Sequence, residues 1–143
     1  MKLHPKYIVA TLAYLMGIFL LSHLPGADSA QGGLSLIPER LQNFLHIPLF
    51  AGLAWCMLMS LSNGQWRKTI PLWCYGVVGF LAILYAVADE WHQSFVPGRF
   101  PSVRDVFMDC VGIVGLLFAH RVWNRDVSAE RSTGALLLKG NAR

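Results

Sequence analysis

Four long stretches of this sequence consist almost entirely of apolar residues. They run approximately from Tyr7 to Leu24, Leu41 to Leu61, Ile70 to Ala88 and Val103 to Val122. Each approaches the roughly 20 residues that a helix needs to cross about 30 Å of hydrocarbon, and each is apolar on all sides, which suits a helix that faces lipid. Only 14% of the 143 residues are charged, against about 25% in a typical soluble domain. The sequence therefore predicts an all-α protein, a four-helix transmembrane bundle.

The chain is expected to divide into a membrane domain over residues 1–123 and a polar, mobile tail over residues 124–143. We expect the tail to be dispensable beyond about Arg131. The first apolar run follows Lys2 and Lys6, a pattern that is also typical of a signal peptide. Because the rest of the chain is itself a membrane protein, we expect this run to be retained as a span.

The basic residues are distributed unevenly around the apolar runs. If the N-terminus is cytoplasmic, nine of the 12 Lys and Arg residues lie on the inside, and Arg40, Arg99 and Arg104 lie on the outside. An excess of Lys and Arg on the cytoplasmic side is the usual orientation signal, so both termini are predicted to be cytoplasmic. The net charge of +4 is therefore explained by membrane orientation, and we expect no nucleic-acid partner.

Two pairs of glycines lie near the middle of the last two runs, Gly76 with Gly79 and Gly112 with Gly115. Small residues allow helices to approach closely in lipid. We therefore predict that these two helices pack as an antiparallel hairpin, with Gly76 or Gly79 near Gly112 or Gly115.

Polar residues gather where the predicted helices reach the outer face of the membrane, and we expect nothing comparable at the other face or at mid-membrane. They are His46 near the start of the second run, Asp89, Glu90 and Gln93 after the third, Arg99 in the following loop, and Asp105 and Asp109 early in the fourth.

Asp109 is expected to lie below the membrane surface, by about 6–9 Å at 1.5 Å per residue. It shares one side of its helix with Asp105 and Gly112, and this side is expected to pack against the third helix. A carboxylate at that depth requires a partner or a proton, and Arg99 and Arg104 are the nearby cations.

We predict that Glu90, Arg99, Asp105 and Asp109 converge on one outward-opening pocket, with His46 on its wall. The alternative is that such residues only anchor the helices at the membrane interface, as snorkelling side chains do. The density of acids, bases and amides, where lipid-facing residues should be apolar, favours the pocket.

The segment from Asp89 to Gly112 resembles the signature of the VanZ-like family of small polytopic bacterial membrane proteins. The matching residues are Asp89, Glu90, Gln93, Phe95, Pro97, Gly98, Arg99, Asp105 and Gly112, with His46 at the family's upstream histidine. The chain departs from the family at Gln42 and Asn43, where Asp-Lys is common, and at Asp109, where asparagine is usual. The resemblance implies a multi-pass protein of the bacterial inner membrane and a link to glycopeptide resistance, especially to teicoplanin.

Two classes of function remain open for these residues. In a membrane-embedded hydrolase or transferase acting on a lipid-linked or phosphate-bearing envelope substrate, the catalytic candidates are Glu90, Asp105, Asp109 and His46. Arg99, Gln93 and Asp89 would bind the substrate, with Arg99 holding an anionic group.

In a binding protein, the same residues would hold a membrane lipid or lipoglycopeptide without chemistry. Transport is the weakest hypothesis, because transport pathways place ionisable groups near the midplane.

No cofactor and no metal are predicted. A divalent ion held by His46, Glu90 and Asp105 is conceivable, but no H-E-x-x-H or similar spacing supports it. The three cysteines lie in apolar runs and form no C-x-x-C pair, so they indicate neither a disulfide framework nor a zinc site.

Overall fold

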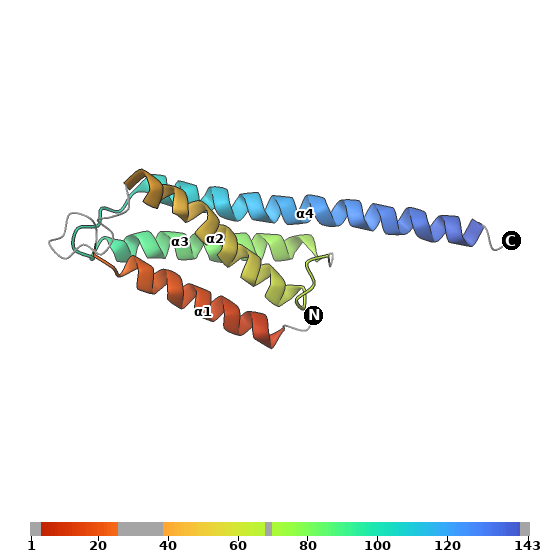
Figure 1. The fold of residues 1–143 in the computed structure, drawn as a ribbon, viewed down its shortest axis with the longest axis horizontal. Coiled ribbons are helices and arrows are strands. Elements are labelled where there is room, and N and C mark those ends of the chain that lie inside the picture. Colours follow the sequence, from red (N-terminus) through yellow and green to blue (C-terminus); the bar gives the residue numbers. More distant parts are fainter. Residues whose placement is uncertain (1–3, 26–38, 68–69, 141–143) are drawn as a thin grey trace.

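A computed structural model describes residues 4–25, 39–67 and 70–140 of the chain. These residues form four helices and contain no strand: α1 (Pro5–Ser22), α2 (Glu39–Leu61), α3 (Leu72–Gln93) and α4 (Val103–Gly140) (Figure 1). Each helix includes an apolar segment long enough to cross a membrane. The prediction of an all-α protein with four transmembrane helices is confirmed.

Local sequence explains where α2 ends and α3 begins. Asn63 and Gly64 have φ angles of 59° and 74°, in the left-handed region, and the Gly64 N–H donates to the Met59 carbonyl at 2.9 Å. This arrangement is a common way to close a helix C-terminus. Pro71 then directly precedes α3. The chain therefore reverses between α2 and α3, and these helices run antiparallel.

Successive helices run in opposite directions, so α1 begins and α4 ends toward the same end of the bundle (Figure 1). This agrees with two termini on one side of the membrane, while the side that they face stays a prediction. The most extensive helix contact joins α2 and α4, and α2 also packs against α1 and α3. Helix α2 is therefore the central element of the bundle.

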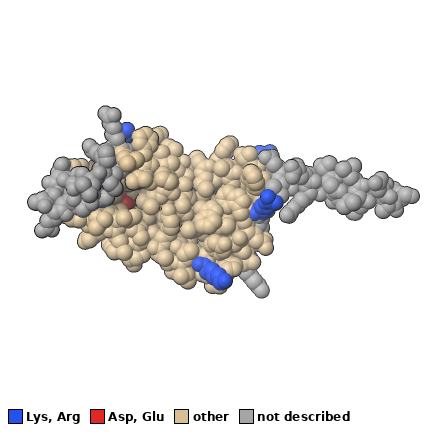
Figure 2. All heavy atoms as spheres, in the orientation of Figure 1, with Lys and Arg blue, Asp and Glu red and all other residues tan. Residues whose placement is uncertain are grey.

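The core and the outer surface are both apolar. Phe50 and Leu53 of α2 are fully buried together with Ile113 of α4, whereas Phe80 and Phe118 are 67% and 69% exposed. Figure 2 shows a broad band of uncharged residues on the visible face, with Lys and Arg near its ends. This distribution is expected of helices that bury one side against each other and turn the other toward lipid.

The prediction that glycines of α3 and α4 meet is wrong, although these two helices do pack together. A methyl group added at Gly112 would collide with the Ile47 carbonyl of α2, and one at Gly79 would lie 3.3 Å from Leu117 of α4. Gly76 and Gly115 have open space beside them. Glycine is needed instead where α2 and α4 approach most closely.

Helix α4 differs from its predicted extent. The apolar span within α4 covers Val103–Arg125, close to the predicted end near Val122. The helix itself continues to Gly140 and projects beyond the other three (Figure 1), so the segment after the span is helical, and its mobility stays a prediction. The segment contains the good helix formers Ala, Leu, Glu, Arg and Lys, and no proline follows Pro101. Its cytoplasmic location stays a prediction.

Candidate functional site

Polar side chains are buried at the end of the bundle where α1 and α3 end and α2 and α4 begin, which we call the polar end. Four acidic or amide side chains there, Asp89, Glu90, Gln93 and Asp109, are at most 5% exposed. Their burial places ionisable groups inside an otherwise apolar helix bundle. Such groups are rare within membrane spans, because each is costly unless paired or neutralised.

A contact between His46 and Asp109 joins α2 to α4. His46 Nδ1 lies 2.9 Å from Asp109 Oδ1, and the two side chains are 13% and 1% exposed. The sequence left a partner or a proton open for Asp109, with Arg99 and Arg104 as the nearby cations, and in the structure its partner is His46. Asp109 lies on the side of α4 that faces α2, the same side on which Gly112 meets Ile47.

Glu90 and Asp105 lie beside this pair. The Ser102 backbone N–H donates to Glu90 Oε2 at 2.9 Å. Glu90 Oε1 is buried and, within the described part of the chain, has no hydrogen-bond partner. One ligand atom each from His46, Glu90 and Asp105 lie within 4.8 Å of one another. We call His46, Glu90, Asp105 and Asp109 the acid–histidine cluster.

A second set of hydrogen bonds starts from Asp89. Its Oδ2 accepts hydrogen bonds from Ser22 Oγ at 2.8 Å and from Gln93 Nε2 at 2.9 Å. Gln93 Oε1 in turn accepts one from Arg99 Nη1 at 3.3 Å. Ser22 was not among the predicted site residues, although its position at the end of the first apolar run could have indicated it. These bonds link α1, α3 and the loop after α3.

Arg99 holds this loop against the end of α1. Its Nε and Nη2 donate to the Leu24 and Leu21 carbonyls at 3.3 and 3.2 Å. Burial lowers the pKa of the guanidinium, and nearby carboxyl groups oppose that effect. The group still remains charged, because arginine does not deprotonate in proteins. The hydrogen bonds of Arg99 thus go to the Gln93 side chain and to two backbone carbonyls.

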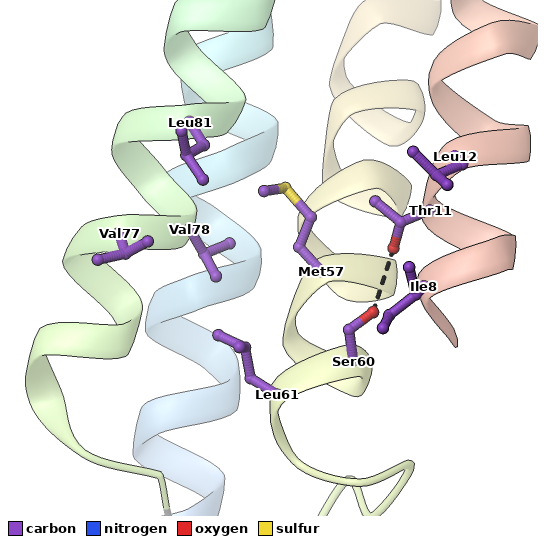
Figure 3. Close-up of a pocket in the computed structure, with 9 residues that line it drawn as sticks. All are labelled: Ile8, Thr11, Leu12, Met57, Ser60, Leu61, Val77, Val78 and Leu81. Atoms are coloured by element: carbon purple, nitrogen blue, oxygen red, sulfur yellow. Dashed lines mark hydrogen bonds between the residues drawn. The ribbon is translucent and has the colours of Figure 1, made fainter. Parts of the chain in front are cut away.

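The predicted outward-opening pocket stays a prediction. A cavity of about 360 Å³ lies in the other half of the bundle (Figure 3). Its lining is almost wholly apolar and comes from α1, α2 and α3, with Thr11 and Ser60 as the polar exceptions (Figure 3). Their hydroxyl oxygens are 3.3 Å apart. This cavity is therefore separate from the polar end, and no acidic, basic or histidine side chain lines it.

The expectation of nothing comparable at the opposite end is wrong. His120 is fully buried there, with its Nδ1 2.9 Å from the Tyr75 hydroxyl and its Nε2 3.2 Å from Asn124 Nδ2. The Asn124 amide also donates to the Trp66 carbonyl at 3.1 Å, and the Trp66 ring packs edge-on against the imidazole. We call these four residues the His120 network. A histidine and an amide four residues apart, where the last apolar run ends, could have indicated it.

These features define a polytopic helical membrane protein with a buried acid–histidine cluster at one end. The chain matches the model of the VanZ/LLP1 family over residues 3–124, and it belongs to this family. This match confirms the resemblance seen in the sequence. No curated protein and no solved structure matches the chain. The chain differs from the usual family residues at Gln42, Asn43 and Asp109. The side chains of Gln42 and Asn43 lie outside the described part of the structure, and the Asp109 carboxyl group contacts the His46 ring.

Proposed function

We propose that this protein acts in the bacterial inner membrane as an enzyme, a hydrolase or transferase whose substrate is a lipid-linked, phosphate-bearing molecule of the cell envelope. The observation that carries the proposal is the convergence of His46, Glu90 and Asp105, with Asp109 hydrogen-bonded to His46. Buried acids and bases in a membrane bundle are costly, so their concentration in one place favours chemistry over simple anchoring.

The contacts suggest a role for each member of the cluster. Asp109 fixes the orientation of the His46 ring through Nδ1, which leaves Nε2 to accept or return a proton. Glu90 is held through one carboxyl oxygen by the Ser102 N–H, so its second oxygen is available as acid or base. Arg99 ties the loop after α3 to the end of α1, Gln93 and Asp89 continue the same set of hydrogen bonds, and these three side chains contact the head group of the substrate.

A second candidate is binding without chemistry, in line with the link to teicoplanin resistance that the resemblance to the VanZ-like family implies. A VanZ-family protein that holds a lipid-linked precursor or a lipoglycopeptide at the membrane surface would lower susceptibility to teicoplanin. In this case the acid–histidine cluster recognises polar groups of the ligand, and no bond is broken.

Mass spectrometry of copurifying lipids separates the two candidates. Wild type, Glu90→Gln and the exposed-site control Arg104→Gln are purified from the same host, and teicoplanin susceptibility is measured in parallel. For an enzyme, Glu90→Gln retains a lipid-linked substrate that the wild type and the control turn over, and susceptibility changes with it.

For a binding protein, wild type and control carry the same ligand, and Glu90→Gln carries less of it. If no envelope lipid is enriched in any of the three proteins and susceptibility is unchanged, both candidates are wrong.

A further inference from the structure

The ligand-capable atoms of His46, Glu90 and Asp105 are close enough together to share one small ligand. They come from three different helices, α2, α3 and α4, and one atom from each lies within 4.8 Å of the others. Around a tetrahedral ion with bonds of about 2.1 Å, ligand atoms are about 3.4 Å apart. Rotations of the three side chains by a small amount would therefore bring them onto a common ion.

A second observation points to a ligand at the same place. Glu90 is 5% exposed, and Ser102 occupies only its Oε2. Its Oε1 is buried without a hydrogen-bond partner among the described residues. A buried polar atom without a partner costs free energy comparable to a lost hydrogen bond, and more when the group is charged. A cation bound to this oxygen would remove the cost.

His46 is oriented as a metal-bound histidine usually is. Its Nδ1 is hydrogen-bonded to Asp109, which is fully buried, so Nε2 is the nitrogen that can bind an ion. A carboxylate behind a ligating histidine fixes the ring and raises its basicity. Asp109 would thus support the site without binding the ion itself.

We propose that His46, Glu90 and Asp105 bind one divalent first-row transition ion, with Asp109 as the partner that orients His46. One imidazole and two carboxylates suit Zn²⁺, Mn²⁺ or Fe²⁺, and three protein ligands leave a coordination position open for water or substrate. The two ligand carboxylates balance the charge of the ion.

This inference rests on the proposed function and revises the roles given there, because with the ion bound His46 Nε2 and Glu90 Oε1 act as ligands and not as proton carriers. A phosphate-bearing head group would be repelled by Glu90 and Asp105 alone. A divalent ion held between them reverses the local sign of the charge and can bind a phosphate oxygen directly. Metal binding is nevertheless measured without any substrate, so the two ideas can fail separately.

The test uses the full-length protein in detergent, stripped with EDTA and titrated with Mn²⁺ while free ion is followed by electron paramagnetic resonance. Mn²⁺ is preferred over Zn²⁺ as the probe, because His23 and His92, whose ring nitrogens are 3.3 Å apart, offer a competing pair of imidazoles. We expect one saturable Mn²⁺ site per chain, and a weakening of at least about tenfold in Glu90→Gln.

Asp89→Asn is the matched control. It removes a carboxylate that is as buried as Glu90 and lies one residue earlier on α3, but Asp89 is bonded to Ser22 and Gln93 and does not belong to the set of three. Its affinity for Mn²⁺ should remain within about twofold of wild type, whereas a ligand change costs tenfold or more. Equal weakening in both variants would show diffuse attraction to negative charge and overturn the proposal.

Absence of saturable Mn²⁺ and Zn²⁺ binding in the wild type would also overturn it, whatever the variants do. If Glu90→Gln does not fold, Asp105→Asn replaces it with the same expectation. Saturable binding without any effect on copurifying lipids would leave the metal site standing and count against the proposed function alone.

Discussion

Each end of the bundle has a histidine packed between its helices, His46 with a side chain 13% exposed and His120 fully buried, and the two have different surroundings. His46 is paired with a carboxylate, and two further carboxylates, Glu90 and Asp105, lie near it. His120 has a phenol hydroxyl and an amide as hydrogen-bond partners, and an indole ring against its face. One surrounding consists of carboxyl groups, and the other of neutral polar and aromatic groups.

The difference separates two reasons for burying polar groups in a membrane protein. Neutral partners such as Tyr75 and Asn124 satisfy an imidazole at low cost, and the result ties α3, α4 and the loop at Trp66 together. Carboxylates cost much more to bury, and replacing a buried ion pair by apolar residues often stabilises a protein. The acid–histidine cluster is therefore better explained by function, and the His120 network by stability.

Among the proposed substitutions, His46→Ala is expected to lower the free energy of unfolding the most. The change leaves the fully buried Asp109 carboxylate without its partner, which typically costs about 3–5 kcal/mol. The free energy of unfolding is measured by titration from mild detergent into SDS. Asp109→Asn should cost much less, because an amide oxygen can still accept the hydrogen bond from His46. A loss below about 1 kcal/mol in His46→Ala would show that the pair contributes little.

His120→Ala tests the other end and should have the next largest effect. It removes two side-chain hydrogen bonds and leaves a cavity beneath Trp66, for an expected loss of about 2–4 kcal/mol. The folded fraction should retain the wild-type pattern of copurifying lipids, because His120 lies at the opposite end from the cluster. If His120→Ala keeps full stability but changes that pattern, the division between the two ends is wrong.

Much of the fold could be predicted from the sequence because the thickness of a bilayer fixes the length of a spanning helix. The observed bounds of α1, α2 and α3 lie within a few residues of the apolar runs. The gathering of His46, Glu90, Asp105 and Asp109 could also be predicted, because alternating helix directions bring the start of α2, the end of α3 and the start of α4 to one end.

The detailed partners could not be predicted in the same way. These helices are apolar on all sides, so the sequence carries no periodic signal for which side of α4 faces α2. For that reason His46 was not expected as the partner of Asp109, and Gly112 was expected near a glycine of α3. The His120 network was missed because Tyr75 on α3 and Trp66 in the preceding loop lie far in sequence from His120 and Asn124 on α4.

Gly112→Ala addresses the contact between α2 and α4 that carries the His46–Asp109 pair. An added methyl group would collide with the Ile47 carbonyl, and overpacking of this kind costs about 1–3 kcal/mol. The matched control is Gly115→Ala, one turn later, where the methyl group meets open space. Alanine there should raise the free energy of unfolding by about 0.5–1 kcal/mol through helix propensity. An equal change in the free energy of unfolding for Gly112→Ala and Gly115→Ala would contradict the close approach of α2 and α4 at Gly112.

The smallest effect on stability is expected from Arg99→Ala, compared with Arg104→Ala. Both changes remove one positive charge from the polar end, so any general electrostatic effect is matched. Arg99 donates three hydrogen bonds, to Gln93 and to two carbonyls at the end of α1, and is half-buried. Allowing for its partial exposure to solvent, we expect a loss of about 1–2 kcal/mol, and less than about 0.5 kcal/mol for the exposed Arg104.

The copurifying lipids distinguish Arg99→Ala from Arg104→Ala more clearly than stability alone does. Without Arg99 the loop after α3 loses its link to α1, and Ser102, whose N–H holds Glu90 Oε2, lies at the end of that loop. Arg99→Ala should therefore change the copurifying lipids in the same direction as Glu90→Gln, and Arg104→Ala should not. Arg99→Lys should restore little, because one ammonium group cannot reproduce the planar set of donors that reaches Gln93, Leu21 and Leu24 together. Equal behaviour of the two alanine variants in both measurements would show that Arg99 is an ordinary interfacial arginine, and that the acid–histidine cluster keeps its geometry without the loop.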